Sequence, residues 1–125
     1  MRKQYYFRPS PNGYYAWDVD RLVNLSSKLT PQKIPLVDIK EINENYWFDE
    51  DGNQPTCRAI AEHARLIEET DLSHPIIMCS KRRIMDGMHR VLKALNNNQS
   101  SIDALIFEQD PEPDYVDVSP DDLPY

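Results

Sequence analysis

The stretch 86–90, with the sequence DGMHR, brings a carboxylate, a glycine, an imidazole and a guanidinium together in the chain. Residues 84–85 before it are apolar, and an apolar run at helical spacing follows it. The pattern therefore predicts a strand that passes through Gly87 into a helix. A helix N-terminus has unpaired N–H groups and partial positive charge, and so attracts phosphate. Because Gly87 lets a ligand come close, and His89 and Arg90 can donate to phosphate oxygens, the stretch indicates a phosphate-binding turn.

A purely structural interpretation of the same turn stays open. Asp86 can cap the helix by accepting a hydrogen bond from the N–H of Met88 or His89, Gly87 can simply permit a tight junction, and His89 can lie in the core. The two interpretations compete, because a carboxylate on those N–H groups repels an incoming phosphate. A metal ion or a ribose hydroxyl that engages Asp86 would reconcile them, so Asp86 is the candidate ligand for Mg²⁺.

The other apolar patterns predict an α+β fold, a single domain with a small mixed sheet and packed helices. We expect an N-terminal arm and helix over 1–33, a central domain over 34–107 and an acidic extended tail over 108–125. The predicted elements are a turn at 11–13, a helix over 19–29 capped by Asp18, a strand over 36–39, a loop over 43–56, a helix over 57–69, strands over 76–78 and 83–86 joined by a turn at 80–82, a helix over 88–97 and a last strand over 102–107.

Two of these helices have apolar stripes that predict which face is buried. In the helix over 57–69 the inward residues are expected to be Ile60, Ala64 and Ile67. In the helix over 88–97 they are expected to be Val91, Leu92 and Leu95.

The net charge of −7 comes from the end of the chain. Residues 108–125 contain seven acidic side chains and no Lys or Arg, and the other 107 residues hold 14 acidic and 14 basic ones. A neutral body binds duplex DNA poorly, because that affinity depends on neutralised phosphates. The tail is either disordered or laid along the body by its apolar and aromatic residues, which are Tyr115, Val116, Val118 and Tyr125.

The patterns of cysteine, histidine and hydropathy indicate the redox state, the metal content and the cellular location of the protein. Cys57 and Cys79 are far apart and in no CxxC pattern, and we expect free buried thiols. The three histidines show no zinc spacing with either cysteine. No apolar stretch reaches the length of a membrane span, and the N-terminus lacks the apolar core of a signal peptide. We therefore expect a cytoplasmic protein.

Over residues 34–107, the order of strand, loop, helix, DLSHPIIM, hairpin, RIMDGMHRVLKAL and strand resembles the N-terminal domain of ParB and its relatives in the ParB/sulfiredoxin superfamily. The stretches AWDVDRL, PTCRAIAEHARLI and PEPDYV also look like a group of small bacterial proteins labelled ParB-like. In that superfamily the Gly-X-His-Arg turn is the phosphate site of a nucleotide. The resemblance therefore implies that Asp86, Gly87, Met88, His89 and Arg90 bind a nucleotide.

The turn is most similar to that of the free-serine kinase branch, which has Asp-Gly-His-His-Arg where this chain has residues 86–90. That branch uses ADP or ATP, magnesium and a glutamate base on the loop after the first strand. Glu41 and Glu44 lie in that region here, so the resemblance makes them candidate catalytic residues together with His89. The alternative is that both glutamates are solvated loop carboxylates. The nucleotide is expected to be ATP, ADP or CTP.

Two departures from the superfamily narrow the expected activity. Sulfiredoxin has a cysteine where this chain has Met88, which is neither a nucleophile nor a thiolate, so sulfinic acid repair is not expected. Partition proteins continue into a helix-turn-helix domain and a dimerisation domain, and this sequence shows neither. Sequence-specific DNA binding is therefore not expected.

Other side chains have both a functional and a structural interpretation. His63, on the helix over 57–69, can face the site or be partly exposed and structural. Trp47 and Phe48 can stack on a base or pack the loop against the body. The acidic run 49–51 followed by Gly52 suggests a cation loop, but it lacks the ligand spacing of an EF-hand and is expected to be a solvated tip.

Two hypotheses for the function follow. The first is an NTPase or a nucleotide-dependent phosphotransferase of the ParB/sulfiredoxin type. The second is a non-catalytic ParB-like accessory module that engages a protein partner, with the acidic tail either pairing with a basic surface or folding over the phosphate site as a plug.

Overall fold

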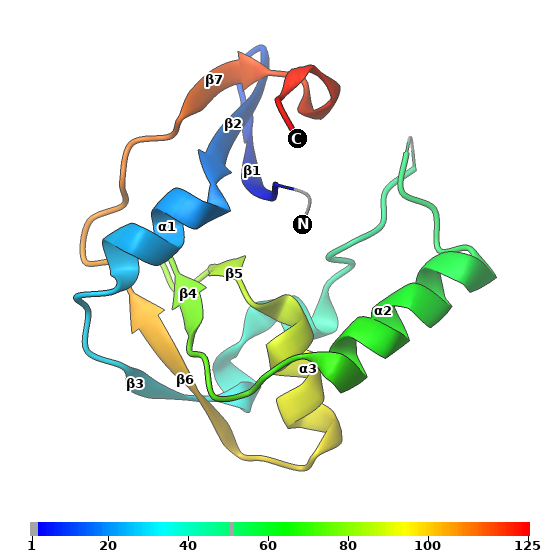
Figure 1. Ribbon diagram of the computed structural model, residues 1–125, viewed down its shortest axis with the longest axis vertical. Helices are drawn as coiled ribbons and strands as arrows, with labels where there is room; N and C mark the ends of the chain where they lie inside the picture. Colours follow the sequence, from blue (N-terminus) through cyan, green and yellow to red (C-terminus); the bar gives the residue numbers. More distant parts are fainter. Residues whose placement is uncertain (1–2, 51) are drawn as a thin grey trace.

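The computed structural model describes residues 3–50 and 52–125, and within them the chain forms one α+β domain with two small sheets and three α-helices (Figure 1). The predicted fold class is confirmed at this level. None of the helices in the described residues has the length and apolar character that a membrane span needs.

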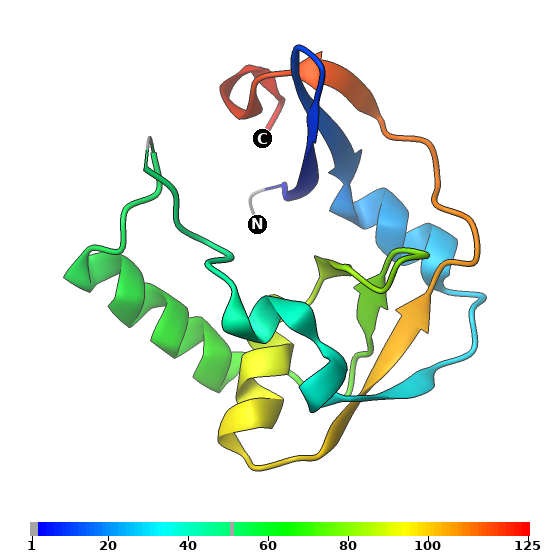
Figure 2. The same cartoon turned by 180° about the vertical axis from the view of Figure 1, so that it is seen from behind.

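The first sheet joins the two ends of the chain (Figures 1 and 2). Strand β1 (Tyr5–Ser10) turns back into β2 (Gly13–Asp18), as the Pro-Asn-Gly sequence predicts, and β7 (Tyr115–Val118) pairs with the other edge of β2. All three strands are antiparallel and lie in the order β1-β2-β7. Of the two alternatives for the tail, the one that lays it along the body is therefore confirmed.

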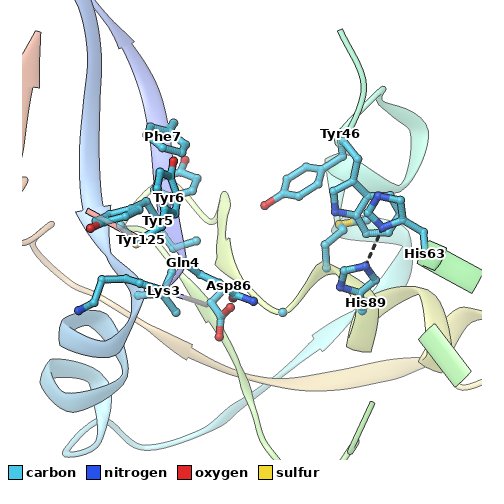
Figure 3. Close-up of a pocket in the computed structure, with 15 residues that line it drawn as sticks. Lys3, Gln4, Tyr5, Tyr6, Phe7, Tyr46, His63, Asp86, His89 and Tyr125 are labelled. Atoms are coloured by element: carbon cyan, nitrogen blue, oxygen red, sulfur yellow. Dashed lines mark hydrogen bonds between the residues drawn. The ribbon is translucent and has the colours of Figure 1, made fainter. Parts of the chain in front are cut away.

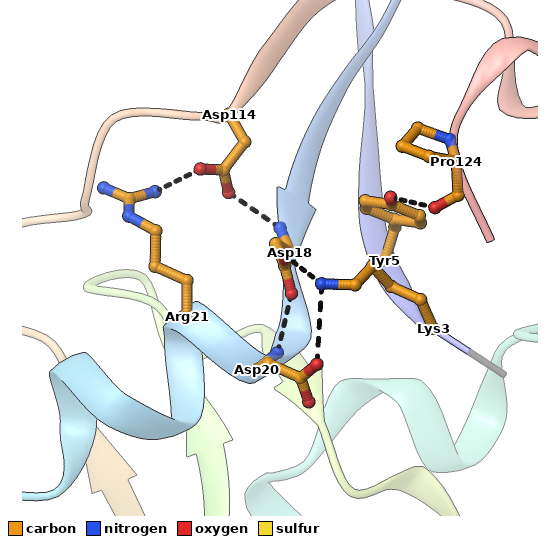
Figure 4. A network of polar contacts seen from close by, with 7 residues as sticks. All are labelled: Lys3, Tyr5, Asp18, Asp20, Arg21, Asp114 and Pro124. Atoms are coloured by element: carbon orange, nitrogen blue, oxygen red, sulfur yellow. Dashed lines mark hydrogen bonds and ion pairs between the residues drawn. The ribbon is translucent and has the colours of Figure 1, made fainter. Parts of the chain in front are cut away.

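Acidic side chains of the tail bind the body. Asp114 accepts hydrogen bonds from the backbone N–H of Asp18 at 2.8 Å and from the Arg21 guanidinium at 3.1 Å (Figure 4). Asp117 accepts from the Ser10 hydroxyl at 2.6 Å, and this bond is the main reason that its pKa lies below the usual range. Asp114 and Asp117 thus help to hold the tail in place.

The second sheet has the strand order β3-β6-β4-β5, in which β4 and β6 run parallel and the other neighbours antiparallel. Its strands are β3 (Gln32–Pro35), β4 (Ile76–Met78), β5 (Ile84–Asp86) and β6 (Ser101–Ile106). The prediction of the hairpin β4–β5 is confirmed. Strand β6 begins one residue before its predicted start, and it is not the last strand, because β7 follows.

The predicted strand over 36–39 is wrong. Residues Leu36–Asp38 form a 3₁₀ turn, and the strand that pairs with β6 is β3, just before it. Leu36 and Ile39 are both buried and three residues apart, a spacing that a 3₁₀ turn places on one side and a strand does not. Val37 between them is 93% exposed. A second 3₁₀ turn, Lys40–Asn43, follows before the loop.

Local signals set where the helices begin. Helix α1 (Val19–Ser26) is capped by the Asp18 carboxylate, as predicted, but ends at Ser26 and not at residue 29. Helix α2 (Cys57–Glu69) has the predicted bounds and is capped by the Thr56 hydroxyl. Helix α3 (Met88–Asn96) ends one residue before the predicted position.

The buried faces of α2 and α3 agree only in part with the predicted ones. In α3 Val91 is buried and Leu92 packs against the core, as predicted, but Met88 and Ala94 are buried as well and Leu95 is 41% exposed. Helix α2 projects from the body and packs along α3, and none of its residues is buried (Figure 1). Its partly buried side is formed by Ala59, His63 and Ile67, so Ile60 and Ala64 lie on the exposed side. Cys57 is also exposed, contrary to expectation, while Cys79 is buried and both thiols are free.

Strand β4 separates two hydrophobic clusters because its side chains alternate between the faces of the sheet. Ile76 and Met78 belong to the cluster shared with α3, and Ile77 belongs to a cluster with Trp17 of β2 and Leu22 of α1. The first sheet and α1 are therefore fastened to one face of the second sheet, and α3 to the other. The strand end of β5 lies between them, where the chain turns into α3.

Candidate functional site

The predicted strand–glycine–helix junction is confirmed. Strand β5 ends at Asp86, Gly87 is the N-cap residue of α3 with φ 111° and ψ 22°, and α3 starts at Met88. A Cβ atom on Gly87 would lie 2.7 Å from Cγ2 of Ile76 and 2.7 Å from Nη2 of Arg90. The glycine is required both by its backbone angles and by the close approach of these side chains.

Asp86 does not cap α3. The N-cap position has no side-chain hydrogen bond, and the Asp86 carboxylate instead pairs with the Arg90 guanidinium at 3.1 Å. Burial raises the pKa of Asp86, while Arg90 acts in the opposite direction. The capping interpretation is wrong because the carboxylate leans toward Arg90, one helical turn along, and away from the first amides of α3.

The turn borders a cleft of about 530 Å³ between the two halves of the fold. On one side the cleft is lined by residues 85–89 together with Tyr46, Trp47 and His63. On the other it is lined by residues 3–7 and by Tyr125. Figure 3 shows the aromatic side chains of these two sides facing the space between them. Asp86, Gly87, Met88 and His89 are thus brought to one cleft, whereas Arg90 lies behind the turn.

Two histidines and a tryptophan form a compact cluster at this cleft. Nδ1 of His63 lies 2.9 Å from Nε2 of His89, which joins α2 to α3. The Trp47 ring stacks on both imidazoles, with centroid distances of 4.0 Å to His63 and 4.5 Å to His89. Burial and the neighbouring His63 lower the pKa of His89 to about 4. His63 therefore belongs to the site. The face of the Trp47 ring is covered by the two imidazoles, and the side chain also packs against the hydrophobic core.

The two candidate base residues are engaged elsewhere. Glu41 is 3% exposed, accepts a hydrogen bond from the Ile84 N–H at 2.8 Å and lies 3.3 Å from Nε of Arg83. Glu44 binds the same guanidinium through both carboxylate oxygens. The two glutamates thus clamp Arg83 and fix the loop that carries Tyr46 and Trp47. Neither carboxylate lines the cleft.

The basic residues near the turn do not converge on it. Lys81 and Arg82 are exposed in the hairpin turn, and Lys93 donates to backbone carbonyls at the end of α2. Among the cationic side chains of residues 3–50 and 52–125, Lys3 is the one that lines the cleft, and it arrives from the opposite side. Its ammonium group lies 2.7 Å from the Asp18 carboxylate (Figure 4), and this bond raises the pKa of Lys3.

The acidic tip of the loop has a local structural role. The Asp49 carboxylate accepts hydrogen bonds from the backbone N–H of Gly52 at 2.6 Å and of Asn53 at 3.0 Å, which closes the tip. Asp51, the third member of the predicted acidic run, lies outside the described residues. In the part of the chain that the structure describes, no three His, Cys, Asp or Glu side chains are grouped as metal ligands. Phe48 lies edge-on to His63.

Comparison with known proteins adds no relative: the chain matches no family model, no curated protein and no solved structure. The function is therefore argued from the geometry of the cleft.

Several cleft residues were missed by the sequence reasoning. Tyr46 and Lys3 were not singled out, and residues 5–6 were predicted only as part of the N-terminal arm and helix over 1–33. The cluster of aromatic residues near the N-terminus was a signal, but nothing local showed that this arm faces the turn at Gly87. Tyr125, from the acidic tail, reaches the cleft because β7 places it there.

Proposed function

We propose that the cleft beside Gly87 binds a nucleotide through its phosphate groups, and that the protein is a ParB/sulfiredoxin-like nucleotide-binding protein. The observation that carries the proposal is the start of α3. Its first amides have no side-chain cap, and they open through a left-handed glycine onto an aromatic cleft. Such a terminus attracts anions, because its N–H groups are unpaired and carry partial positive charge.

The aromatic walls of the cleft support a nucleotide over a simple anion. Tyr46 on one side and Tyr5 and Tyr6 on the other line the same cleft as the turn (Figure 3). Aromatic stacking on a base is favourable and tolerant of base identity. The resemblance to the ParB/sulfiredoxin superfamily implies ATP, ADP or CTP, and the aromatic lining of the cleft supports that class without selecting one of them.

Asp86 determines what must accompany the phosphates. Its carboxylate lines the cleft, and Arg90 balances it only in part, since burial raises the pKa of Asp86 more than the guanidinium lowers it. A polyphosphate therefore needs Mg²⁺ or a hydroxyl group between itself and Asp86. In this proposal Asp86 would hold the Mg²⁺, which would neutralise part of the charge of the phosphates.

Turnover as an NTPase or phosphotransferase is the stronger form of the proposal. Among the three candidate catalytic residues, His89 is the one that lines the cleft and can act on a phosphate there. Glu41 and Glu44 do not act as the base here, because both carboxylates are paired with Arg83. They serve to position the loop that forms one wall of the cleft.

Calorimetric titration with ATP, ADP and CTP, each with Mg²⁺, tests the proposal. We expect at least one to bind, and we expect His89→Ala to weaken binding at least tenfold. Arg90→Ala should abolish binding, because the uncompensated Asp86 charge would then repel the phosphates. His74→Ala is the matched control, since His74 is exposed and distant from the turn in the chain. Binding unaffected by both His89→Ala and Arg90→Ala would place the nucleotide elsewhere, and no binding at all would reject the proposal.

A second candidate function is a non-catalytic module that binds a protein partner. The projecting helix α2 favours it, because Ile60 and Leu66 are 54% and 44% exposed on a helix with no buried residue. The two functions separate by experiment. A double variant, Ile60→Ser with Leu66→Ser, leaves the cleft lining intact and should not change nucleotide affinity, whereas loss of a partner complex would support this candidate.

A further inference from the structure

The two imidazoles at the cleft meet edge to edge. Nδ1 of His63 and Nε2 of His89 are 2.9 Å apart, the ring centroids are 5.1 Å apart, and the ring planes differ by 20°. Rings lying face to face at van der Waals contact would have closer centroids. The short N···N distance and the small interplanar angle therefore describe two nearly coplanar rings with one hydrogen bond between them (Figure 3).

This arrangement fixes how many protons the pair can hold. In the neutral pair one proton lies between the rings, and one outer nitrogen, either Nδ1 of His89 or Nε2 of His63, has a free lone pair. A single added proton fills that lone pair and leaves the central hydrogen bond intact. A second added proton would set two N–H groups against each other. The His63–His89 pair thus accepts one proton where two separate histidines accept two.

The surroundings keep the free pair neutral but tolerate one positive charge. Burial is the first cause that lowers the pKa of both imidazoles. Of the charged groups in the described residues, Glu62 acts on His63 in the opposite direction, and Lys3 and Asp86 share the cleft with His89. In the loop packed against the pair, the residues whose rings contact the imidazoles are Trp47 and Phe48. One of them, Trp47, stacks on both imidazoles, and an aromatic face stabilises a cation.

We propose that the His63–His89 pair takes up one proton from solvent when a phosphate group binds at the turn of Gly87, which makes His63 a positioning residue of that site and couples anion binding to protonation. This inference rests on the proposed nucleotide site. The negative charge of the phosphate favours the protonated pair, and in that state both outer nitrogens carry a hydrogen. His89 then donates through Nδ1 whichever ring holds the central proton, and His63 shares the charge.

Calorimetry with ADP and Mg²⁺ at pH 6.5, in two buffers of different ionisation enthalpy, counts the protons taken up. We expect about 0.5 to 1 proton per bound nucleotide in the wild-type protein, because a phosphate within a few ångströms can raise the pKa of the pair above the working pH. Affinity should correspondingly increase as the pH falls from 8 to about 6. His63→Gln should bind ADP but take up less than half of the wild-type proton number, because an amide keeps the hydrogen bond and cannot share the charge.

The controls separate this inference from the nucleotide proposal. His74→Gln, which changes an exposed histidine, should keep the wild-type proton number, and thermal melting should show that each variant folds. ADP that binds without proton uptake, or an unchanged proton number in His63→Gln, would overturn the coupling while leaving the site in place. No heat with ADP, ATP or CTP would overturn the site itself and the coupling with it.

Discussion

Replacing Gly87 with alanine tests the construction of the turn most directly. The angles φ 111° and ψ 22° are open to glycine and strained for any other residue, at about 1–3 kcal/mol. The new Cβ would also lie 2.7 Å from Cγ2 of Ile76 and 2.7 Å from Nη2 of Arg90. The guanidinium can move, since it is the end of a flexible side chain. Ile76 cannot, because it is fully buried in the core, and overpacking there costs about 1–3 kcal/mol more.

Together these effects predict that Gly87→Ala lowers the free energy of unfolding by about 4 kcal/mol. For a chain of this length that corresponds to a fall in Tm of about 12–15 °C. Urea denaturation followed by circular dichroism measures the free energy. Gly52→Ala is the matched control, because its Cβ would meet only a carboxylate oxygen of Asp49 at 3.7 Å, and it should change stability by less than about 0.5 kcal/mol. A loss below about 1 kcal/mol in Gly87→Ala would refute this account of the turn.

Three further predictions follow from other contacts. The pKa of His89 is lowered from 6.5 to about 4 in the folded protein, so the unfolded state binds the proton more readily. The free energy of unfolding in urea should therefore fall as the pH drops from about 6.5 toward 4, and this fall should be smaller in His89→Gln. Glu41→Ala should lower the free energy of unfolding by about 3 kcal/mol, since it leaves Arg83 and the buried Ile84 N–H without their buried partner. Glu44→Ala, at the exposed end of the same clamp, should lower it by less than about 1 kcal/mol. Equal losses in the two variants would contradict the distinction between the buried and the exposed glutamate. Lys93→Ala should speed amide hydrogen exchange in α2 while changing global stability by about 1 kcal/mol or less, because its ammonium group binds two backbone carbonyls at the end of that helix; unchanged exchange would show that α2 is held by other contacts.

Local chemistry made several parts of the fold predictable. The bounds of α2 follow from the Thr56 cap and from an uninterrupted helical pattern, and the hairpin β1–β2 follows from Pro-Asn-Gly. The junction at Gly87 was predictable because a strand that turns sharply into a helix needs a glycine at the join. Each of these features depends on residues within a few positions of one another. Such residues are close in space whatever the tertiary structure is, so their interactions can be predicted from the sequence.

The predicted strand over 36–39 shows where such reasoning fails. Residues that are apolar at positions 36 and 39 fit a short strand or a 3₁₀ turn almost equally well, because four residues are too few to distinguish the two periods. The choice was made by pairing: the Leu36 N–H binds the Ser100 carbonyl at 3.0 Å, and β3 before it occupies the edge of β6. The same limit applies to α2. Its apolar stripe predicts a buried face, but the stripe does not show how little of that face the rest of the fold covers.

By itself the sequence determined that Asp86, Gly87, Met88 and His89 stand together at the start of a helix, because they are neighbours in the chain. The tertiary structure alone decided what faces them. His63 and His89 are 26 positions apart, and Asp117 binds Ser10 across 107 positions to hold the tail that carries Tyr125 to the cleft. Contacts of this kind form only when sheets and helices pack. The contact between Asp86 and Arg90 is local, because the two residues are four positions apart, and what packing decided there is the burial of the pair, which raises the pKa of Asp86.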